Sequence, residues 1–481
     1  MSRFLACGSL SLLALLLLPL RAEAAEEGRL FAVLIGVEKY EKAAQLPCIM
    51  NDVRQLARTL AERGGVSQER ILQVLETNDG AEKPRPTKEG IMRAVAEQLA
   101  RVGPTDTFLL FFSGHGFQGP EDGKLYLAPI ECDPRRAVET GVPVEWLREQ
   151  LAASRAGFKL LLIDSCHAGT AKGGVDAVSL PPKALAAPFS EINDVVTIAS
   201  SDGAEKSQIW TARDHSLFTY WLIQGLKGHA DTEDGVIDID ELYNYVSRNV
   251  KRSVKQHPSL FELPQSPRRY IGPRIDGVPA VIRLQPQSLK QSLADLAEQI
   301  AWDLQCEGLE KVGVLEFIES DNVLGRDFGL LGRYCSDELE RMLFQRGDEG
   351  FKVIGRERLK SALSEAGFGV GDVGSAEKMM ELTRKSGSMP AIVLGTLTEG
   401  NGRVLSMKVK LRSTEDFADA GGGFAFAGLN ESEWAMIGRS VEVSSDDRRQ
   451  PAPQLDVAPR RLEESLLPRL EERGWAPVGD L

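Results

Sequence analysis

Two short stretches, Thr107-Phe-Leu-Leu-Phe-Phe-Ser-Gly-His-Gly116 and Phe158-Lys-Leu-Leu-Leu-Ile-Asp-Ser-Cys-His-Ala-Gly169, decide how this chain is expected to fold. Each is an apolar run that ends in small and polar residues, a pattern typical of a buried strand in a parallel sheet. In open parallel sheets, reactive groups gather just beyond the carboxyl ends of the strands. The two stretches therefore predict that His115 and Cys166 lie at one edge of a sheet.

A cysteine beside a histidine is a nucleophile beside its base, because the thiolate attacks and the imidazole manages the proton. The pair predicts a cysteine peptidase. His115 precedes Cys166 by 51 residues, close to the roughly 50 residues that separate the two in caspases. The two blocks resemble the Ser-Gly-His-Gly and Asp-Ser-Cys-His-x-Gly motifs of the caspase superfamily, in its metacaspase and bacterial caspase-like branch. The Gln-Ala-Cys block of true caspases is absent.

The resemblance covers residues 29–272 and implies a caspase-like domain there. Strand and helix patterns alternate over the same residues, which independently predicts an α/β fold with a mostly parallel sheet and flanking helices. The resemblance also implies roles at the site. Cys166 would attack the scissile carbonyl, His115 would handle the proton, and the backbone amides of Gly116 and Cys166 would bind the oxyanion.

Substrate preference follows from the same resemblance. Metacaspases place acidic residues in the first specificity pocket, and the matching positions here are Asp52, in Cys48-Ile-Met-Asn-Asp52, and Asp164. A pocket for a charged side chain must supply the opposite charge. We therefore expect cleavage after Arg or Lys. The alternative for Asp52 is that it only caps the helix expected over 51–63.

The amino-terminal residues predict export. Arg3, the apolar run from Leu10 to Leu20, and Ala22-Glu-Ala24 follow the order of a secretory signal peptide, so residues 1–24 are expected to be removed. The mature protein would then be periplasmic or extracellular; the alternative is an uncleaved anchor. No later segment is apolar for long enough to span a membrane.

Charge and cysteine content exclude several classes of protein. The net charge is −13, and no cluster of Lys and Arg is present, so nucleic-acid binding is not expected. The cysteines are few and scattered, which fits neither a disulfide scaffold nor a zinc site. No cofactor is expected to be required. Residues 231–241 partly resemble a calcium-binding EF-hand loop, but a principal carboxylate is missing and an acidic turn is favoured. Calcium dependence therefore stays open, and no metal ligands are assigned.

The stretch between Gly169 and Ile192 lacks periodicity and is expected to be an exposed loop. Self-cleavage there could occur at Lys172 or Lys183, although an ordinary flexible loop is an equal alternative. Residues 273–290 are expected to form a linker, and residues 446–481 a polar tail.

Residues 291–445 show a second α/β pattern, similar to periplasmic domains of curli-secretion and penicillin-binding-protein-activator proteins. That similarity implies assembly or interaction with envelope partners. Two functions follow for the whole chain. One is an exported cysteine endopeptidase that cleaves peptide or protein substrates after Arg or Lys. The other is a catalytically silent caspase-like scaffold that binds through its C-terminal domain. An esterase or transferase that uses the same dyad is a weaker third.

Overall fold

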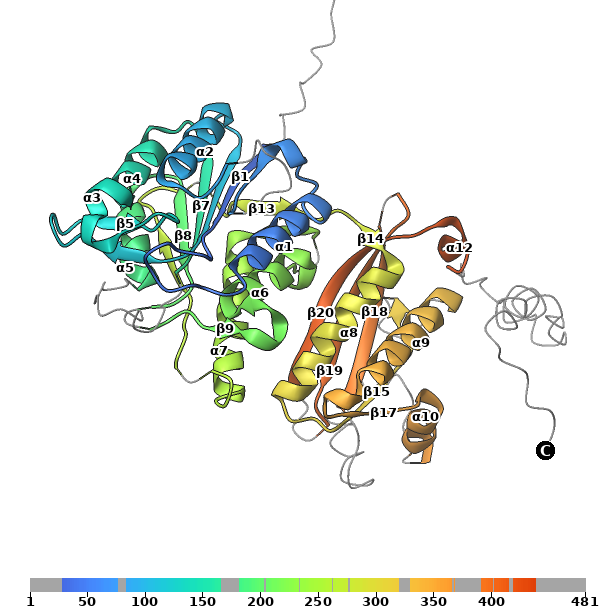
Figure 1. Cartoon of the computed structure of the whole chain (residues 1–481). Helices are drawn as coiled ribbons and strands as arrows, with labels where there is room; N and C mark the ends of the chain where they lie inside the picture. The colour runs from blue at the N-terminus through green and yellow to red at the C-terminus, as the bar shows by residue number, and fades with distance from the viewer. Residues whose placement is uncertain are drawn as a thin grey trace, which may run out of the picture.

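The computed structural model describes residues 28–76, 84–165, 181–202, 205–232, 234–261, 263–275, 277–319, 329–365, 367, 391–400, 402–414 and 418–437. The expected signal peptide and the polar tail lie outside these residues. Two units, each built on its own sheet, lie side by side (Figure 1). The boundaries predicted for the domains remain predictions.

The first unit contains a six-stranded sheet in the order β12-β8-β7-β3-β1-β2. All neighbouring strands are parallel except β12, which runs antiparallel to β8. The predicted mostly parallel sheet is thus confirmed. The strands are β1 (Leu30–Gly36), β2 (Ile71–Val74), β3 (Thr107–Ser113), β7 (Phe158–Asp164), β8 (Val195–Ala199) and β12 (Arg268–Ile271).

Helices cover both faces of this sheet because successive strand residues point to opposite faces. Leu34 of β1 packs in the core under one set of helices, whereas Val33 and Ile35 pack in the core under the other. The first set is α1 (Ile49–Glu62), α6 (Leu217–Gln224) and α7 (Ile239–Gln256). The second set is α2 (Lys88–Arg101), α4 (Val144–Ala153) and α5 (Pro182–Ala186). The short α3 (Ala137–Thr140) lies between β5 and α4 in the chain.

Smaller strands decorate the first unit. They are β4 (Gly116–Gln118), β5 (Leu125–Leu127) and β6 (Val142–Pro143) in one sheet, the hairpin β9 (Ile209–Trp210) and β10 (His215–Ser216), and the pair β11 (Val236–Asp238) and β13 (Ala280–Arg283). β13 falls within the stretch expected to be a linker and runs antiparallel to β11. That stretch therefore holds part of its backbone against the first unit.

The second unit is a mixed sheet in the order β14-β20-β19-β18-β15-β17, with β16 also paired to β18. The strands are β14 (Gln287–Ser288), β15 (Lys311–Val314), β16 (Ile318–Glu319), β17 (Lys352–Ile354), β18 (Ala391–Gly400), β19 (Val404–Arg412) and β20 (Asp419–Gly428). The helices are α8 (Leu289–Cys306), α9 (Gly329–Gln345), α10 (Arg356–Glu365) and α12 (Glu431–Trp434). Helices α8 and α9 lie across the sheet (Figure 1).

The local predictions agree with most of this structure and differ over residues 182–191. The runs 391–398 and 403–411, joined at Glu399-Gly-Asn-Gly402, predict a hairpin, which the structure contains as β18 and β19. Thr87 before the helical pattern of 88–101 predicts a helix start, and its hydroxyl caps α2 by accepting from the Gly90 amide. The predicted exposed loop is wrong over 182–191: Lys183 lies in α5, and its ammonium pairs with Asp202 at 3.1 Å. Lys172 lies outside the described residues.

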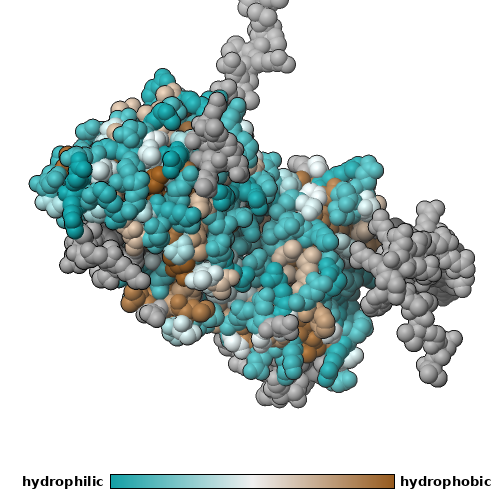
Figure 2. Space-filling model, in the orientation of Figure 1, coloured by the Kyte–Doolittle hydropathy of each residue, from teal (hydrophilic) through white to brown (hydrophobic). Residues whose placement is uncertain are grey.

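The face of the molecule shown in Figure 2 is mostly hydrophilic, and its hydrophobic residues gather in small patches along the lower edge of both units. Among the described residues, no helix combines the length and hydrophobicity needed to cross a membrane.

Candidate active site at the carboxyl edge of the first sheet

The strands that precede His115 and Cys166 end side by side. β3 and β7 pair in parallel from Thr107 opposite Phe158 to Ser113 opposite Asp164, and the Gly114 amide donates to the Asp164 carbonyl at 3.3 Å. His115 follows Ser113 by two residues. Cys166, which follows Asp164 by two residues, lies outside the described residues. The register thus ends the two strands that lead to the expected nucleophile and its expected base at the same edge of the sheet.

His115 is held by the segment that joins β1 to α1. Its backbone amide donates to the Tyr40 hydroxyl at 2.7 Å, and the two ring centroids are 4.7 Å apart. Its Nε2 lies 2.9 Å from the Ala44 carbonyl oxygen. Because a carbonyl can only accept, Nε2 carries the hydrogen, and in the neutral ring the lone pair is on Nδ1. This tautomer is the one that can accept a proton through Nδ1.

The glycines on either side of His115 are required by close packing. A Cβ at Gly114 would come within 2.7 Å of the Tyr40 hydroxyl. A Cβ at Gly116, the residue expected to help bind the oxyanion, would overlap the side chain of Leu185 in α5. The chain that follows the expected nucleophile therefore folds back over the backbone beside His115.

The structure brings Asp52 and Asp164 into one buried polar cluster, and both carboxylates have no exposed surface. Asp52 Oδ1 lies 2.6 Å from His215 Nδ1, and its Oδ2 accepts from the Ser216 amide at 3.1 Å. The Ser216 hydroxyl donates to Asp164. Ser216 therefore bridges the two acids, with its backbone bound to one and its side chain bound to the other.

Asp164 accepts from two further hydroxyls. Ser207 Oγ donates to Oδ1 at 2.6 Å, and Thr219 Oγ1 donates to Oδ2 at 2.8 Å. Thr219 lies in the first turn of α6, whose N-cap is Ser216. Hydroxyl donors stabilise a carboxylate less than a paired cation would. Among the described residues, no Lys or Arg forms an ion pair with Asp52 or Asp164.

The pKa of Asp52 is raised from its ordinary value of 3.8 to about 7. Burial is the largest cause, the contact with His215 lowers the pKa, and the nearby Asp164 raises it. Asp52 is not the helix cap, because Cys48 occupies the N-cap of α1 and Asp52 lies in the first turn. The alternative in which Asp52 only caps the helix is therefore wrong.

The residues that hold the two acids were missed as site residues in the sequence. His215 lies 163 residues from Asp52, so no local pattern could pair them. The signal that was available is the Ser216-Leu-Phe-Thr219 start of a helix, in which a serine caps the first turn. That signal predicts the helix start and says nothing about the acids that share its hydroxyl.

The acidic segment considered for calcium uses its carboxylates internally. Asp231 accepts from the amides of Asp234 and Gly235, both at 3.2 Å. Glu241 accepts from Thr232 and from the Asp238 amide, the latter as part of the capping box that starts α7. These bonds explain the segment as the turn that starts a helix.

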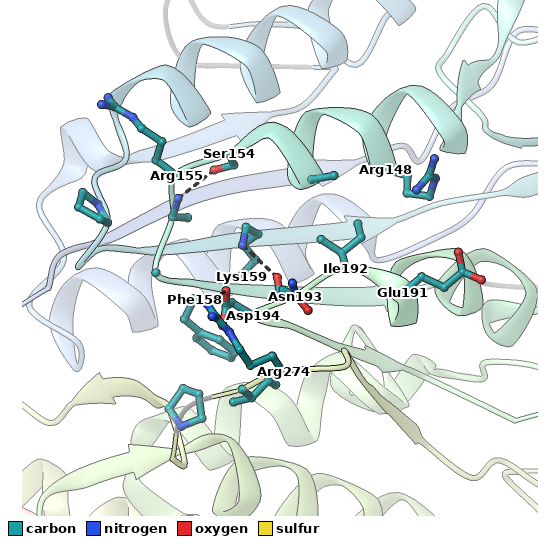
Figure 3. A pocket seen from close by; sticks show the side chains of 16 residues that line it. Arg148, Ser154, Arg155, Phe158, Lys159, Glu191, Ile192, Asn193, Asp194 and Arg274 are labelled. Carbon is teal, nitrogen blue, oxygen red and sulfur yellow. Dashed lines mark hydrogen bonds and ion pairs between the residues drawn. The ribbon is translucent and has the colours of Figure 1, made fainter.

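A pocket of about 650 Å³ opens at the opposite edge of the same sheet (Figure 3). It is lined by the starts of β7 and β8, and the buried Lys159 donates to the Asn193 carbonyl at 3.2 Å within it. Since Phe158 and Lys159 open the strand that Asp164 ends, this cavity is separated from His115 by the length of β7. It is not part of the candidate active site.

The described cysteines are poor nucleophiles. Cys48, Cys132, Cys306 and Cys335 are free and buried, and burial raises the pKa of each thiol to about 12. None of these four thiols has the lowered pKa that a reactive thiolate at neutral pH requires, and Cys166 lies outside the described residues.

Comparison with known proteins gives matches to the first unit. A family described as "Caspase domain" matches residues 29–266. Metacaspase-4 of Arabidopsis thaliana is 29% identical over 145 residues, which cover 29% of this chain and 33% of that protein. The chain thus spans about a third of the length of this curated relative.

Solved structures match each unit at low identity. Caspase-1 from Spodoptera frugiperda matches with a TM-score of 0.35 at 16% identity, over 51% of this chain and 87% of that one. The LpoB C-terminal domain from Salmonella enterica matches with a TM-score of 0.23 at 15% identity, over 29% of this chain and 98% of that one.

Proposed function

Because residues 29–266 belong to the caspase family, we propose that this protein is a cysteine endopeptidase in which Cys166 is the nucleophile and His115 its acid and base. The observation that carries the proposal is the β3–β7 register, which ends the two strands leading to these residues opposite each other. Tyr40 and Ala44 orient the His115 ring, so its Nδ1 can accept the thiol proton and later protonate the leaving amine.

The oxyanion that develops on the scissile carbonyl needs preorganised donors, each worth about 3 kcal/mol in comparable sites. Family resemblance assigns this role to the backbone amides of Gly116 and Cys166. The close packing beside Gly116 supports the assignment, since it fixes the backbone at that position.

We further propose cleavage after Arg or Lys. The support is electrostatic: Asp52 and Asp164 are buried together, and hydroxyl, amide and imidazole groups surround them instead of a paired Lys or Arg. A guanidinium or ammonium group of the substrate would supply the missing positive charge. Because both acids are fully buried here, a basic side chain can reach them only if part of the structure around them moves.

That burial also favours the second candidate, a silent caspase-like scaffold. Asp164 already accepts three hydroxyl groups of its own chain, so the cluster is satisfied without a substrate. In that case the second unit would carry the function as a binding or assembly domain for envelope partners.

Export, periplasmic or extracellular localisation and independence of cofactors complete the proposal. The order of basic, apolar and small residues over 1–24 supports export. Amino-terminal sequencing of the mature protein tests it, and a chain that begins at Ala25 is expected.

The decisive assay for the endopeptidase is hydrolysis of fluorogenic peptides that end in Arg, Lys or Asp, with calcium or with a chelator. Cleavage after Arg or Lys that is abolished in Cys166→Ala is expected. Cleavage after Asp would keep the enzyme and overturn the role of the two acids. No turnover by folded protein in any condition would favour the scaffold.

A further inference from the structure

Helix α8 of the second unit belongs to two hydrophobic cores at once. Most of its buried apolar residues, among them Leu293, Leu296 and Ile300, pack in the core of the second sheet. Trp302 and Cys306 instead pack in the core of the first unit, with residues of α6 and α7. One edge of α8 therefore packs against the unit that carries the candidate active site.

Trp302 completes an aromatic cluster in the first unit. Its ring centroid lies 5.0 Å from that of Trp210 and 5.1 Å from that of Trp221, and only 4% of its surface is exposed. Tilted aromatic pairs at such distances stabilise a contact beyond the area they bury. Trp210 is in β9, so the cluster ends on the β9–β10 hairpin.

Glu298, one turn before Trp302 on α8, contacts the same hairpin through polar groups. Its Oε1 accepts from Arg213 Nη1 at 3.4 Å and from the Tyr220 hydroxyl at 3.1 Å. The Arg213 guanidinium also stacks over the rings of Trp210 and Tyr220, 5.5 Å and 5.7 Å from their centroids. α8 thus contacts both the hairpin and the helix that follows it.

This hairpin carries the residues that hold the two buried acids. In its register Trp210 lies opposite His215 and Ile209 opposite Ser216. His215 contacts Asp52, and Ser216 contacts both Asp52 and Asp164. Trp302 therefore contacts one strand of the hairpin, through Trp210, and the two acids contact the other strand, through His215 and Ser216.

We propose that Glu298 and Trp302 are positioning residues for the specificity pocket. Through them, α8 of the second unit holds the β9–β10 hairpin, and the hairpin holds Asp52 and Asp164 where they bind a basic side chain of the substrate. This inference rests on the proposed peptidase function. The second unit is then a part of the substrate-recognition apparatus, and a partner that displaces α8 would change the affinity for substrate. Since Glu298 and Trp302 touch neither acid, they act through the hairpin.

The same helix offers a matched control. Glu307, at the end of α8, accepts from Arg252 Nη2 of α7 at 2.7 Å. This ion pair also joins the two units, but it contacts α7 and not the hairpin. If α8 only fastens the units together, changes at Glu298 and Glu307 should have the same effects.

The test uses full-length Glu298→Gln, Trp302→Leu and Glu307→Gln, assayed on an Arg peptide. We expect KM to rise about threefold for Glu298→Gln, as the loss of a partly exposed ion pair implies. For Trp302→Leu we expect a rise of about tenfold, because the ring contacts with Trp210 and Trp221 are lost. The value of kcat and the rate at which iodoacetamide alkylates Cys166 should stay near those of the wild type. Glu307→Gln should leave all three quantities unchanged.

Hydrogen exchange provides a readout that does not require activity. Peptides that cover 209–219 should exchange faster in Glu298→Gln and Trp302→Leu, whereas peptides that cover 107–115 should not. Unchanged exchange over 209–219, or an equal effect of Glu307→Gln, would overturn the inference. If the wild type hydrolyses no peptide, the peptidase proposal fails, and the exchange data still decide whether α8 holds the hairpin.

Discussion

Replacing Asp52 by asparagine removes a titratable group from the buried cluster and keeps a side chain of the same shape. Burial raises the pKa of Asp52 from 3.8 to about 7, with Asp164 adding to the effect and His215 opposing it. A shift of about three units corresponds to roughly 4 kcal/mol between the two protonation states. Because Asp52 is fully buried, solvent screening does not reduce this figure.

The sign of the effect follows from proton binding. Between pH 4 and pH 7 the folded state keeps the Asp52 proton that the unfolded state has lost, so the free energy of unfolding falls as the pH rises. Above the pKa of Asp52 in the folded state, both states have lost the proton, and the loss in free energy of unfolding no longer changes with pH. Between pH 5 and pH 8, the stability of the wild type relative to Asp52→Asn should therefore fall by about 3 kcal/mol.

Urea unfolding followed by tryptophan fluorescence measures this difference, because Trp210, Trp221 and Trp302 lie in one cluster in contact with the hairpin. Asp106→Asn is the control. Arg29 holds the pKa of the buried Asp106 carboxyl below its usual range, so Asp106 is ionised in both states over this interval and its replacement should add no slope. If the stability curves of Asp52→Asn and the wild type run parallel, or diverge in the opposite direction, the pKa of Asp52 is not raised in the folded protein.

Three further outcomes are expected. The KM for an Arg peptide should fall as the pH rises through about 7, where Asp52 becomes charged, and stopped assays from pH 5.5 to 8.5 should show that Asp52→Asn flattens this dependence. Ser216→Ala should lower the free energy of unfolding in urea by about 2 kcal/mol, because it removes a helix cap and a donor to Asp164. A decrease of less than about 0.5 kcal/mol would count against the bridging role of Ser216. Gly395→Ala should destabilise the second unit in thermal unfolding, because a Cβ there would overlap Phe317, and an unchanged midpoint would contradict that packing.

The sequence predicted the elements that are determined locally. The apolar runs of β3 and β7 end where their polar motifs begin, and the sequence pattern predicts helices over 88–101 and 144–153, the bounds of α2 and α4. Such elements depend on periodicity and on residues within a few positions of their ends. The parallel pairing of β3 with β7 follows once both are recognised as buried strands.

The elements that were missed depend on distant neighbours. β20 contains Ala420-Gly-Gly-Gly423, a composition unfavourable for a strand, yet a Cβ at Gly421 would overlap Asp303 of α8 and one at Gly422 would overlap the backbone of β19. The glycines therefore serve the close approach of α8 and β19 to β20. α8 itself has a Ser288 cap and a helical apolar pattern, which are local signals of a helix.

In the candidate site too, some residues could be predicted from the sequence and others depend on distant neighbours. Motifs identified His115, and resemblance identified Asp52 and Asp164, each of which the structure places at or near the carboxyl edge of the sheet. The groups that surround the acids come from Ser207, from the β9–β10 hairpin and from the first turn of α6, none of them close to either acid in the chain. Only a folded structure shows that one serine bridges both acids, or that a tryptophan of the second unit supports the hairpin.

The most direct test of the central claim is covalent labelling of the full-length protein with peptidyl chloromethyl ketones that carry Arg or Asp next to the reactive group. Mass spectrometry of the digested adduct then identifies the modified residue. The account predicts a single adduct on Cys166, formed faster with the Arg reagent than with the Asp reagent and slowed in His115→Ala. Folded protein that forms no adduct on Cys166, or that reacts faster with the Asp reagent, would contradict it.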